Sequence, residues 1–223
     1  MGANGRREYE NRELKTENTA MIIDFANLSG KEAYGAMIQT IVPRPVAWIL
    51  SDNGDDTLNL APFSYFNGVS SKPPTLSVSI GRKGDRSKKD TWRNIEERGR
   101  FVVHIAGVDH AHLVSATSEP LPFGESETTR HGIELLAEEG FGLPRIKDAQ
   151  IAFDCERYQI IEIGDAPQGL VIGQIKRVYV DDEIAEMTGG GLKVDALELN
   201  PLARLGGDDY AQLGETLTIP RPF

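Results

Sequence analysis

Residues 150–181 read QIAFDCERYQIIEIGDAPQGLVIGQIKRVYVD. Two strands are predicted here, from Gln150 to Ile163 and from Gly169 to Asp181, because both segments are rich in β-branched and aromatic residues. The segment Gly164-Asp165-Ala166-Pro167 between them has the composition of a turn. A connection this short joins antiparallel strands, since parallel strands need a crossover of a dozen or more residues. The stretch therefore favours an antiparallel sheet.

Shorter strand patterns occur upstream at hairpin distance. An Asn-Gly turn within Ser51–Asp56 separates two of them, and a third alternates strictly between polar and apolar residues. The predicted strands are Ile41–Leu50, Thr57–Pro62, Thr75–Ile80 and Phe101–Ala106. The predicted helices are Asp90–Glu97, with Asp90 as its N-cap and Gly99 at its end, Asp109–Ser118 and Thr129–Glu139. Many strands with few helices favour a mostly-β fold, an antiparallel barrel.

Composition limits the classes of partner. The chain has 223 residues and a formal net charge of −10, which disfavours nucleic acid and anionic membranes. It contains no apolar run long enough to cross a membrane and no signal-peptide pattern. We expect a cytoplasmic protein with a polar, disordered arm over residues 1–20 and a single domain over residues 21–223. The single cysteine, Cys155, excludes an internal disulfide and a multi-thiolate metal site, and no metal-ligand spacing of histidines is evident.

One segment is basic although the chain as a whole is acidic. Between Arg82 and Arg93 the chain has six basic and two acidic residues, a local charge of +4. Lys89 offers a point charge for a phosphate oxygen, while Thr91 offers a hydroxyl and a backbone N–H near a helix start. Ser79 and Arg82 each add a donor. The alternative interpretation is a solvated charged loop before an ordinary helix.

Aromatic residues upstream of this segment suggest a place for a flat apolar ring. Trp48 shares a strand face with Arg44 and Val46, by the two-residue period of a strand. Because Arg and Trp together are unusual on a core face, this pattern favours a ligand-lining role. The run Pro62-Phe63-Ser64-Tyr65-Phe66 is a second candidate, with core packing as the alternative, favoured for Phe63 and Phe66.

The order of three motifs resembles a known family. They are Pro43-Arg44-Pro45-Val46-Ala47-Trp48, Asn59-Leu60-Ala61-Pro62-Phe63-Ser64-Tyr65-Phe66-Asn67 and Lys89-Asp90-Thr91-x-x-Asn94-Ile95. Together with a later motif, residues 201–207 followed by Tyr210, they resemble the flavin reductase-like, FMN-binding split-barrel family. The resemblance covers roughly residues 33–210. The family includes flavin reductase components of two-component monooxygenases and the flavoredoxins.

The resemblance implies a split β-barrel, a homodimer and an FMN near the subunit interface. By motif, it implies a phosphate site formed by Ser79, Arg82, Lys89, Asp90, Thr91 and Asn94. It implies a ring and ribityl site formed by Trp48, Ala61, Pro62, Phe63 and Ser64, with Tyr210 or a residue near it covering the ring. It implies no catalytic acid.

The implied activity is hydride transfer from NAD(P)H to flavin, with the reduced flavin or its electrons passed to an oxygenase or acceptor protein. A flavoredoxin-type electron carrier is the alternative, and a barrel that binds another phosphorylated ligand is a third. The loop over residues 120–130 and the N-terminal arm do not match the family pattern.

Overall fold

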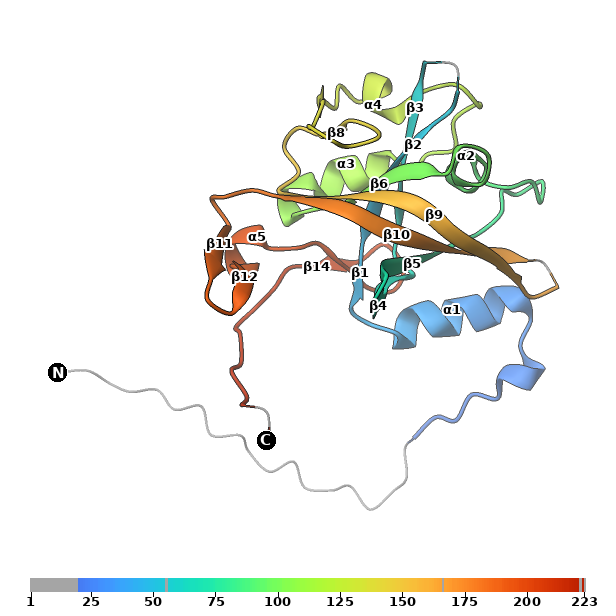
Figure 1. Cartoon of the computed structure of the whole chain (residues 1–223). Helices are drawn as coiled ribbons and strands as arrows, with labels where there is room; N and C mark the ends of the chain where they lie inside the picture. The colour runs from blue at the N-terminus through green and yellow to red at the C-terminus, as the bar shows by residue number, and fades with distance from the viewer. Residues whose placement is uncertain (1–19, 55, 166, 221, 223) are drawn as a thin grey trace.

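The computed structural model describes residues 20–54, 56–165, 167–220 and 222, so the predicted N-terminal arm lies outside it except for Ala20. A seven-stranded sheet dominates the fold (Figure 1), in the order β3-β2-β6-β9-β10-β5-β4. Its strands are β2 (Ala47–Asp52), β3 (Leu58–Phe63), β4 (Phe66–Ser71), β5 (Pro74–Ile80), β6 (Arg100–Ile105), β9 (Ile151–Ile163) and β10 (Gln168–Val180). Every pairing in this sheet is antiparallel, which confirms the predicted mostly-β, antiparallel class.

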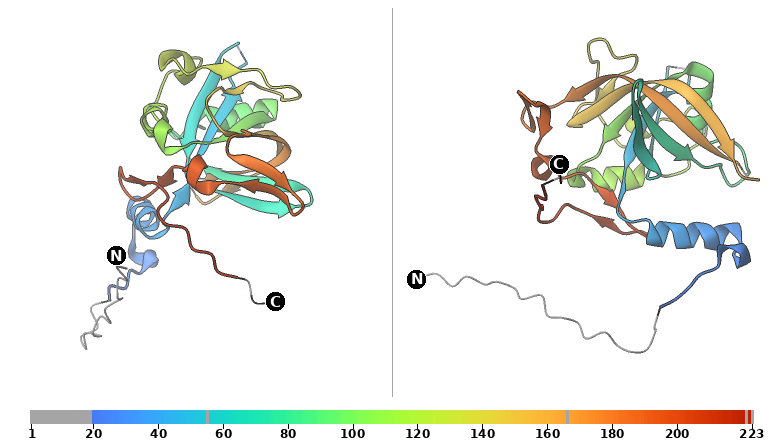
Figure 2. Two further views of the ribbon diagram at one scale, coloured as in Figure 1. Left: turned by 90° about the vertical axis from the view of Figure 1, so that its left-hand side faces the viewer. Right: turned by 60° about the horizontal axis from the view of Figure 1, so that its bottom comes forward.

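Hairpins build the sheet. β9 and β10 pair along their whole length from Ile163 opposite Gln168, and β2 pairs with β3 across the Asn-Gly turn. Two irregularities interrupt the register of β9 and β10. The extra residue is Tyr158 of β9 at the first and Lys176 of β10 at the second. Such irregularities increase the twist of a strand. The two views in Figure 2 show that the sheet curls around its inner face. The curl brings β3 into contact with β5.

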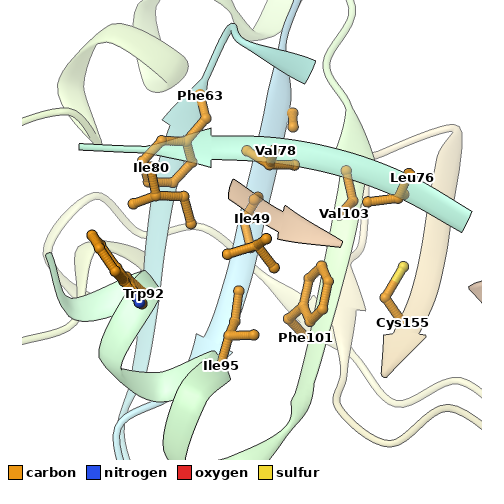
Figure 3. Close-up of a cluster of buried hydrophobic side chains, with 12 residues drawn as sticks. Ile49, Phe63, Leu76, Val78, Ile80, Trp92, Ile95, Phe101, Val103 and Cys155 are labelled. Atoms are coloured by element: carbon orange, nitrogen blue, oxygen red, sulfur yellow. The ribbon is translucent and has the colours of Figure 1, made fainter. Parts of the chain in front are cut away.

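Helix α2 (Asp90–Arg98) packs against the inner face of the curled sheet. Trp92 and Ile95 project from it toward strand residues such as Ile49, Val78 and Phe101 (Figure 3). The neighbouring strand β10 approaches closely: a Cβ added at Gly169 would lie 2.6 Å from the Trp92 ring, and one at Gly173 would lie 2.4 Å from the Phe101 ring. These glycines therefore make room for the two rings.

A second apolar layer covers the outer face of β2. It contains Val46, Trp48 and Leu50, together with residues of α3 (Ala111–Ala116) and the short β7 (Leu135–Leu136) and β8 (Arg145–Ile146). His104 is fully buried here: its Nδ1 donates to the Trp48 carbonyl at 3.0 Å and its Nε2 accepts from the Ile146 amide at 3.0 Å. Burial lowers the pKa of His104 to about 4.

The remaining elements lie around the ends of the sheet. β1 (Arg44–Pro45) pairs with β13 (Ala203–Arg204), which pairs with β14 (Tyr210–Ala211). The other elements are η1 (Phe25–Asn27), α1 (Gly30–Thr40), η2 (Val108–His110), α4 (Glu127–Arg130), β11 (Ala185–Thr188), β12 (Gly191–Val194) and α5 (Ala196–Leu199). None of the described helices has the length and apolar character needed to span a membrane.

Three local predictions are wrong. The helix expected over Thr129–Glu139 ends at Arg130, because Gly132 takes φ +64° and Leu135–Leu136 pairs with β8 instead. Asp90 is the first residue of α2 rather than its N-cap, a position that Lys89 occupies with extended backbone. The strand expected from Ile41 begins at Arg44, and helix α1 before it is absent from the predictions.

Candidate functional site

A cavity of about 440 Å³ lies where β5, the start of α2, the β3–β4 connection, α1 and the C-terminal strands meet. Its volume falls in the range of small-molecule sites, about 300–1,000 Å³. No aspartate or glutamate is among its lining residues, although the chain carries a net charge of −10. The lining consists of Tyr34, Val46, Pro62, Phe63, Ser64, Tyr65, Ser79, Gly81, Arg82, Lys89, Ser118, Gln168, Arg204 and Tyr210.

Lys89 is the distinctive cation of this cavity. Within the described residues it has no carboxylate partner, and its Nζ lies 5.7 Å from the centre of the Phe63 ring. Partial desolvation lowers the pKa of Lys89. Its basic neighbours are neutralised instead: Lys83 lies 2.8 Å from Asp90, Arg82 lies 3.1 Å from Glu162, and the shortest contact of Lys88 with Glu96 is 2.6 Å. Among the basic residues at the start of α2, Lys89 is therefore the one that brings an unpaired positive charge to the cavity.

The N-terminus of α2 lies at the same place. Lys89 is its N-cap, and no side chain of the described residues caps its first turn. The Thr91 hydroxyl is engaged elsewhere, because it accepts from Asn59 Nδ2 at 2.8 Å. Asn94 likewise donates from Nδ2 to Asn53 Oδ1 at 2.8 Å. These buried contacts hold the helix, and its first backbone N–H groups are left for an anion.

Aromatic residues form another part of the lining. Phe63 and Tyr65 come from the β3–β4 region, Tyr34 from α1 and Tyr210 from β14. The Tyr34 and Tyr65 ring centres lie 6.4 Å apart. Tyr65 Oη is buried and has no hydrogen-bond partner within the described part of the chain, and burial raises the pKa of this phenol. A buried phenol without a partner is costly, so a ligand with an acceptor atom fits this position.

The structure brings seven of the predicted site residues together on the cavity. They are Pro62, Phe63, Ser64, Ser79, Arg82, Lys89 and Tyr210. Five others do not line it: Trp48, Ala61, Asp90, Thr91 and Asn94. Trp48 does not face the cavity as the sequence pattern predicted. Its indole is fully buried, and its N–H donates to Thr117 Oγ1 at 2.9 Å. Asp90 pairs with Lys83 and Arg93, and Ala61 packs against the inner core.

Several lining residues are absent from the predicted set. Tyr34 lies on the unpredicted helix α1, whose sequence signal is the capping box formed by Ser29 and Glu32. Arg204 lies inside the motif of residues 201–207, to which the sequence assigned no role. Gly81, Ser118 and Gln168 complete the group, whereas Val46 and Tyr65 already belong to the two sequence patterns proposed to line a ring. The unmatched loop packs elsewhere: Glu127 accepts from the Leu60 amide at 2.8 Å, and Phe123 lies 3.6 Å from the Arg93 guanidinium.

Comparisons with known proteins show the family of the chain. The model of the family described as "Flavin reductase like domain" matches residues 39–197. Nitrilotriacetate monooxygenase component B from Bacillus cereus is 35% identical, with a TM-score of 0.84, and the match covers 91% of this chain and 100% of that one. The 2-nitrobenzoate 2-nitroreductase NbaA from Pseudomonas fluorescens is 28% identical, with a TM-score of 0.80 and coverage of 91% and 96%.

A more distant structure supports the architecture alone. The putative flavin reductase with a split barrel domain from Shewanella frigidimarina NCIMB 400 is 19% identical, with a TM-score of 0.78 and coverage of 91% and 100%. The predicted split barrel is thereby confirmed, and the sheet of this chain is its curled, incompletely closed form. The resemblance seen in the sequence motifs is confirmed as well, and the chain belongs to the flavin reductase-like family.

Proposed function

We propose that the cavity binds FMN and that the chain is an NAD(P)H:flavin oxidoreductase. The observation that carries this proposal is the unpaired Lys89 at an uncapped helix start, directly beside Phe63 and the aromatic lining. A cation and free N–H groups suit a phosphate, and the adjoining aromatic surface suits a flat ring. The membership of the family and the similarity to the 2-nitrobenzoate 2-nitroreductase NbaA support the same class of chemistry.

Two kinds of contact would hold the phosphate. Ser79, Arg82 and Lys89 line the cavity and would contact it with their side chains. Asp90 and Thr91 would contribute backbone N–H groups of the first helical turn, because their side chains are already engaged. Asn94 would act indirectly, since its bonds to Asn53 and Ser51 hold α2 in place.

The ring would lie along Pro62, Phe63 and Ser64, with Tyr210 covering it. Ala61 and Trp48 would support this wall from the protein side. When bound, FMN supplies the hydride-accepting ring, and the protein orients the reactants and excludes water. The absence of acidic residues from the lining agrees with this role, because it leaves no side-chain carboxylate to oppose an electron-rich ring.

We propose that the chain works as a cytoplasmic homodimer, with residues 21–223 as one domain. Nitrilotriacetate monooxygenase component B is by name part of an oxygenase system. An oxygenase or an electron-acceptor protein is therefore the proposed recipient of the reduced flavin or its electrons.

The visible spectrum of the purified protein with added FMN tests the cofactor. We expect perturbed flavin absorption and quenched flavin fluorescence, and a protein that leaves both unchanged would contradict the cofactor assignment. Steady-state NAD(P)H oxidation with excess free FMN tests the reaction. Sustained turnover supports a reductase, whereas FMN binding with negligible turnover points to a flavoredoxin-type carrier.

A further inference from the structure

A second cation lines the cavity on its C-terminal wall. Arg204 lies on β13, and its guanidinium is centred 4.4 Å from the Tyr210 ring. The only side-chain hydrogen bond of Arg204 in the described part of the chain runs to the Gly207 carbonyl, and no carboxylate pairs with the guanidinium there. The stacking and this bond fix the orientation of Arg204, while its other side-chain N–H groups have no acceptor among the described residues. A planar guanidinium held in this way is suited to bind an oxyanion.

A further arginine stands opposite Arg204 on the neighbouring strand. Arg44 is its register partner on β1 and is only 4% exposed. Arg44 donates to the carbonyls of Ile38 and Ile41 at 2.7 Å each and to that of Leu205 at 2.8 Å, with a longer bond to Ser64 Oγ at 3.3 Å. All these acceptors are uncharged. Like charges at opposite positions of neighbouring strands are unfavourable, so an anion at Arg204 would relieve a repulsion built into the fold.

Tyr65 adds a donor at the same wall. Its ring lies 5.9 Å from the Arg44 guanidinium, and the residue lines the cavity. Its buried hydroxyl has no hydrogen-bond partner within the described part of the chain. Arg204 and Tyr65 therefore present unused N–H and O–H donors to a cavity that has no acidic lining residue. This set of donors selects a ligand group that is negatively charged and rich in acceptor oxygens, as a phosphate is.

We propose that Arg204, assisted by Tyr65, binds a phosphate group of the nicotinamide dinucleotide. This inference rests on the proposed function, because hydride transfer requires the dinucleotide and the flavin to share one cavity. The chain has no glycine-rich dinucleotide fingerprint, so side chains must hold the phosphates of the reductant. Lys89 is a separate cation, set against Phe63 rather than Tyr210, and is assigned to the flavin phosphate.

The test compares Arg204→Met and Arg204→Lys with Lys193→Met, which removes an exposed cation of the β11–β12 hairpin outside the cavity. Calorimetric titration of the FMN-loaded protein uses ADP-ribose, which has the pyrophosphate but no nicotinamide, and its 2′-phosphorylated form. We expect Arg204→Met to weaken ADP-ribose binding about tenfold or more, as the loss of a charge-assisted bond implies. The KM for NAD(P)H should rise similarly with kcat largely retained, and Arg204→Lys should lie between. Lys193→Met should behave as the unmodified protein.

The outcomes separate the possibilities. Equal losses with both ADP-ribose probes assign Arg204 to the pyrophosphate, and a loss confined to the 2′-phosphorylated probe assigns it to the 2′-phosphate. Unchanged ADP-ribose binding and unchanged KM in a folded Arg204→Met protein would overturn the proposal. It would equally be overturned if Arg204→Met weakened FMN but not riboflavin, because Arg204 would then hold the flavin phosphate. A protein that binds ADP-ribose through Arg204 but binds no FMN would instead contradict the proposed function alone.

Discussion

At the scale of single residues, Lys89 bears most directly on the proposed phosphate site. Replacing Lys89 by Met should raise the Kd for FMN about ten- to a hundredfold, because a charge-assisted hydrogen bond contributes about 1.5–3 kcal/mol. Riboflavin lacks the phosphate, so its affinity should change by less than about threefold. Fluorescence titration with both flavins measures this difference. Lys147→Met is the control, since Lys147 is an exposed lysine paired with Glu134 away from the cavity. Equal losses for both flavins would refute the phosphate assignment.

A second residue-scale prediction concerns His104 and pH. Burial of the ring holds the folded-state pKa of His104 at about 4, below the ordinary value of 6.5. Arg145 and His110 add to the lowering, and the hydrogen bond to the Trp48 carbonyl opposes it. The unfolded chain therefore takes up a proton first, and the contribution of His104 to stability is present above pH 6.5 and is lost as the pH falls toward 4. By linkage, the loss between pH 7 and pH 5 is about 2 kcal/mol.

Urea unfolding at both pH values measures that loss. His104→Gln should be less stable at pH 7 but should lose about 2 kcal/mol less than the unmodified protein on acidification. The carboxylates titrate in both proteins, so their contribution cancels when the acid-induced loss of one protein is subtracted from that of the other. The same acid-induced loss in both proteins would contradict the assignment.

Trp48 shows how far a residue can be placed from sequence. The two-residue period correctly groups Val46 with Trp48, since both belong to the apolar layer that covers the outer face of β2. Both faces of β2 are buried, however, and Val46 alone of the two lines the cavity. Periodicity assigns a side chain to a face, but the packing of α3 and Thr117 over that face decides whether it is open. Lys89 could be predicted because its signal, a cation at a helix start, is local.

At the scale of elements, the closeness of β10 to the aromatic core gives a stability prediction. Gly173→Ala should destabilise the fold by about 1–3 kcal/mol, because the new methyl group would lie 2.4 Å from the Phe101 ring and the core must shift. Gly68→Ala, on the edge strand β4, is the matched control, since no atom lies within 4 Å of its added Cβ. Chemical denaturation measures both. If Gly173→Ala left the free energy of unfolding unchanged, Phe101 would have to move aside without an energetic cost.

Elements with local signals are those that the sequence predicts. The β2–β3 and β9–β10 hairpins follow from their turn residues and strand composition. The helix expected over Thr129–Glu139 fails because pairing of Leu135 and Leu136 with β8, a tertiary contact, overrides helix propensity. Helix α1 was missed because none of its residues is buried and two glycines weaken its pattern. Its position beside the C-terminal strands depends on Arg44, which donates hydrogen bonds to the carbonyls of Ile38 and Leu205. No sequence pattern predicts these bonds.

At the scale of the whole molecule, α1 leads to the prediction of a dimer. The helix lies outside the curled sheet (Figure 1). Its residues Tyr34 and Met37 and its C-cap Ile41 are 53%, 36% and 49% exposed. Exposed apolar surface of this kind is typical of interaction sites. Tyr34 also lines the cavity, so a partner that covers this face would adjoin the proposed flavin site.

Ile41→Glu should therefore convert a dimer of the 24.5 kDa chain into a monomer, as light scattering after size-exclusion chromatography would measure. The added charge cannot be buried in an apolar interface without a large cost. FMN affinity should fall in the monomer if the partner helps to close the cavity. Leu136→Glu is the control, because Leu136 is similarly exposed, at 44%, but lies on β7 away from α1. A monomeric unmodified protein, or an Ile41→Glu protein that remains dimeric, would show that this face of α1 is not the interface.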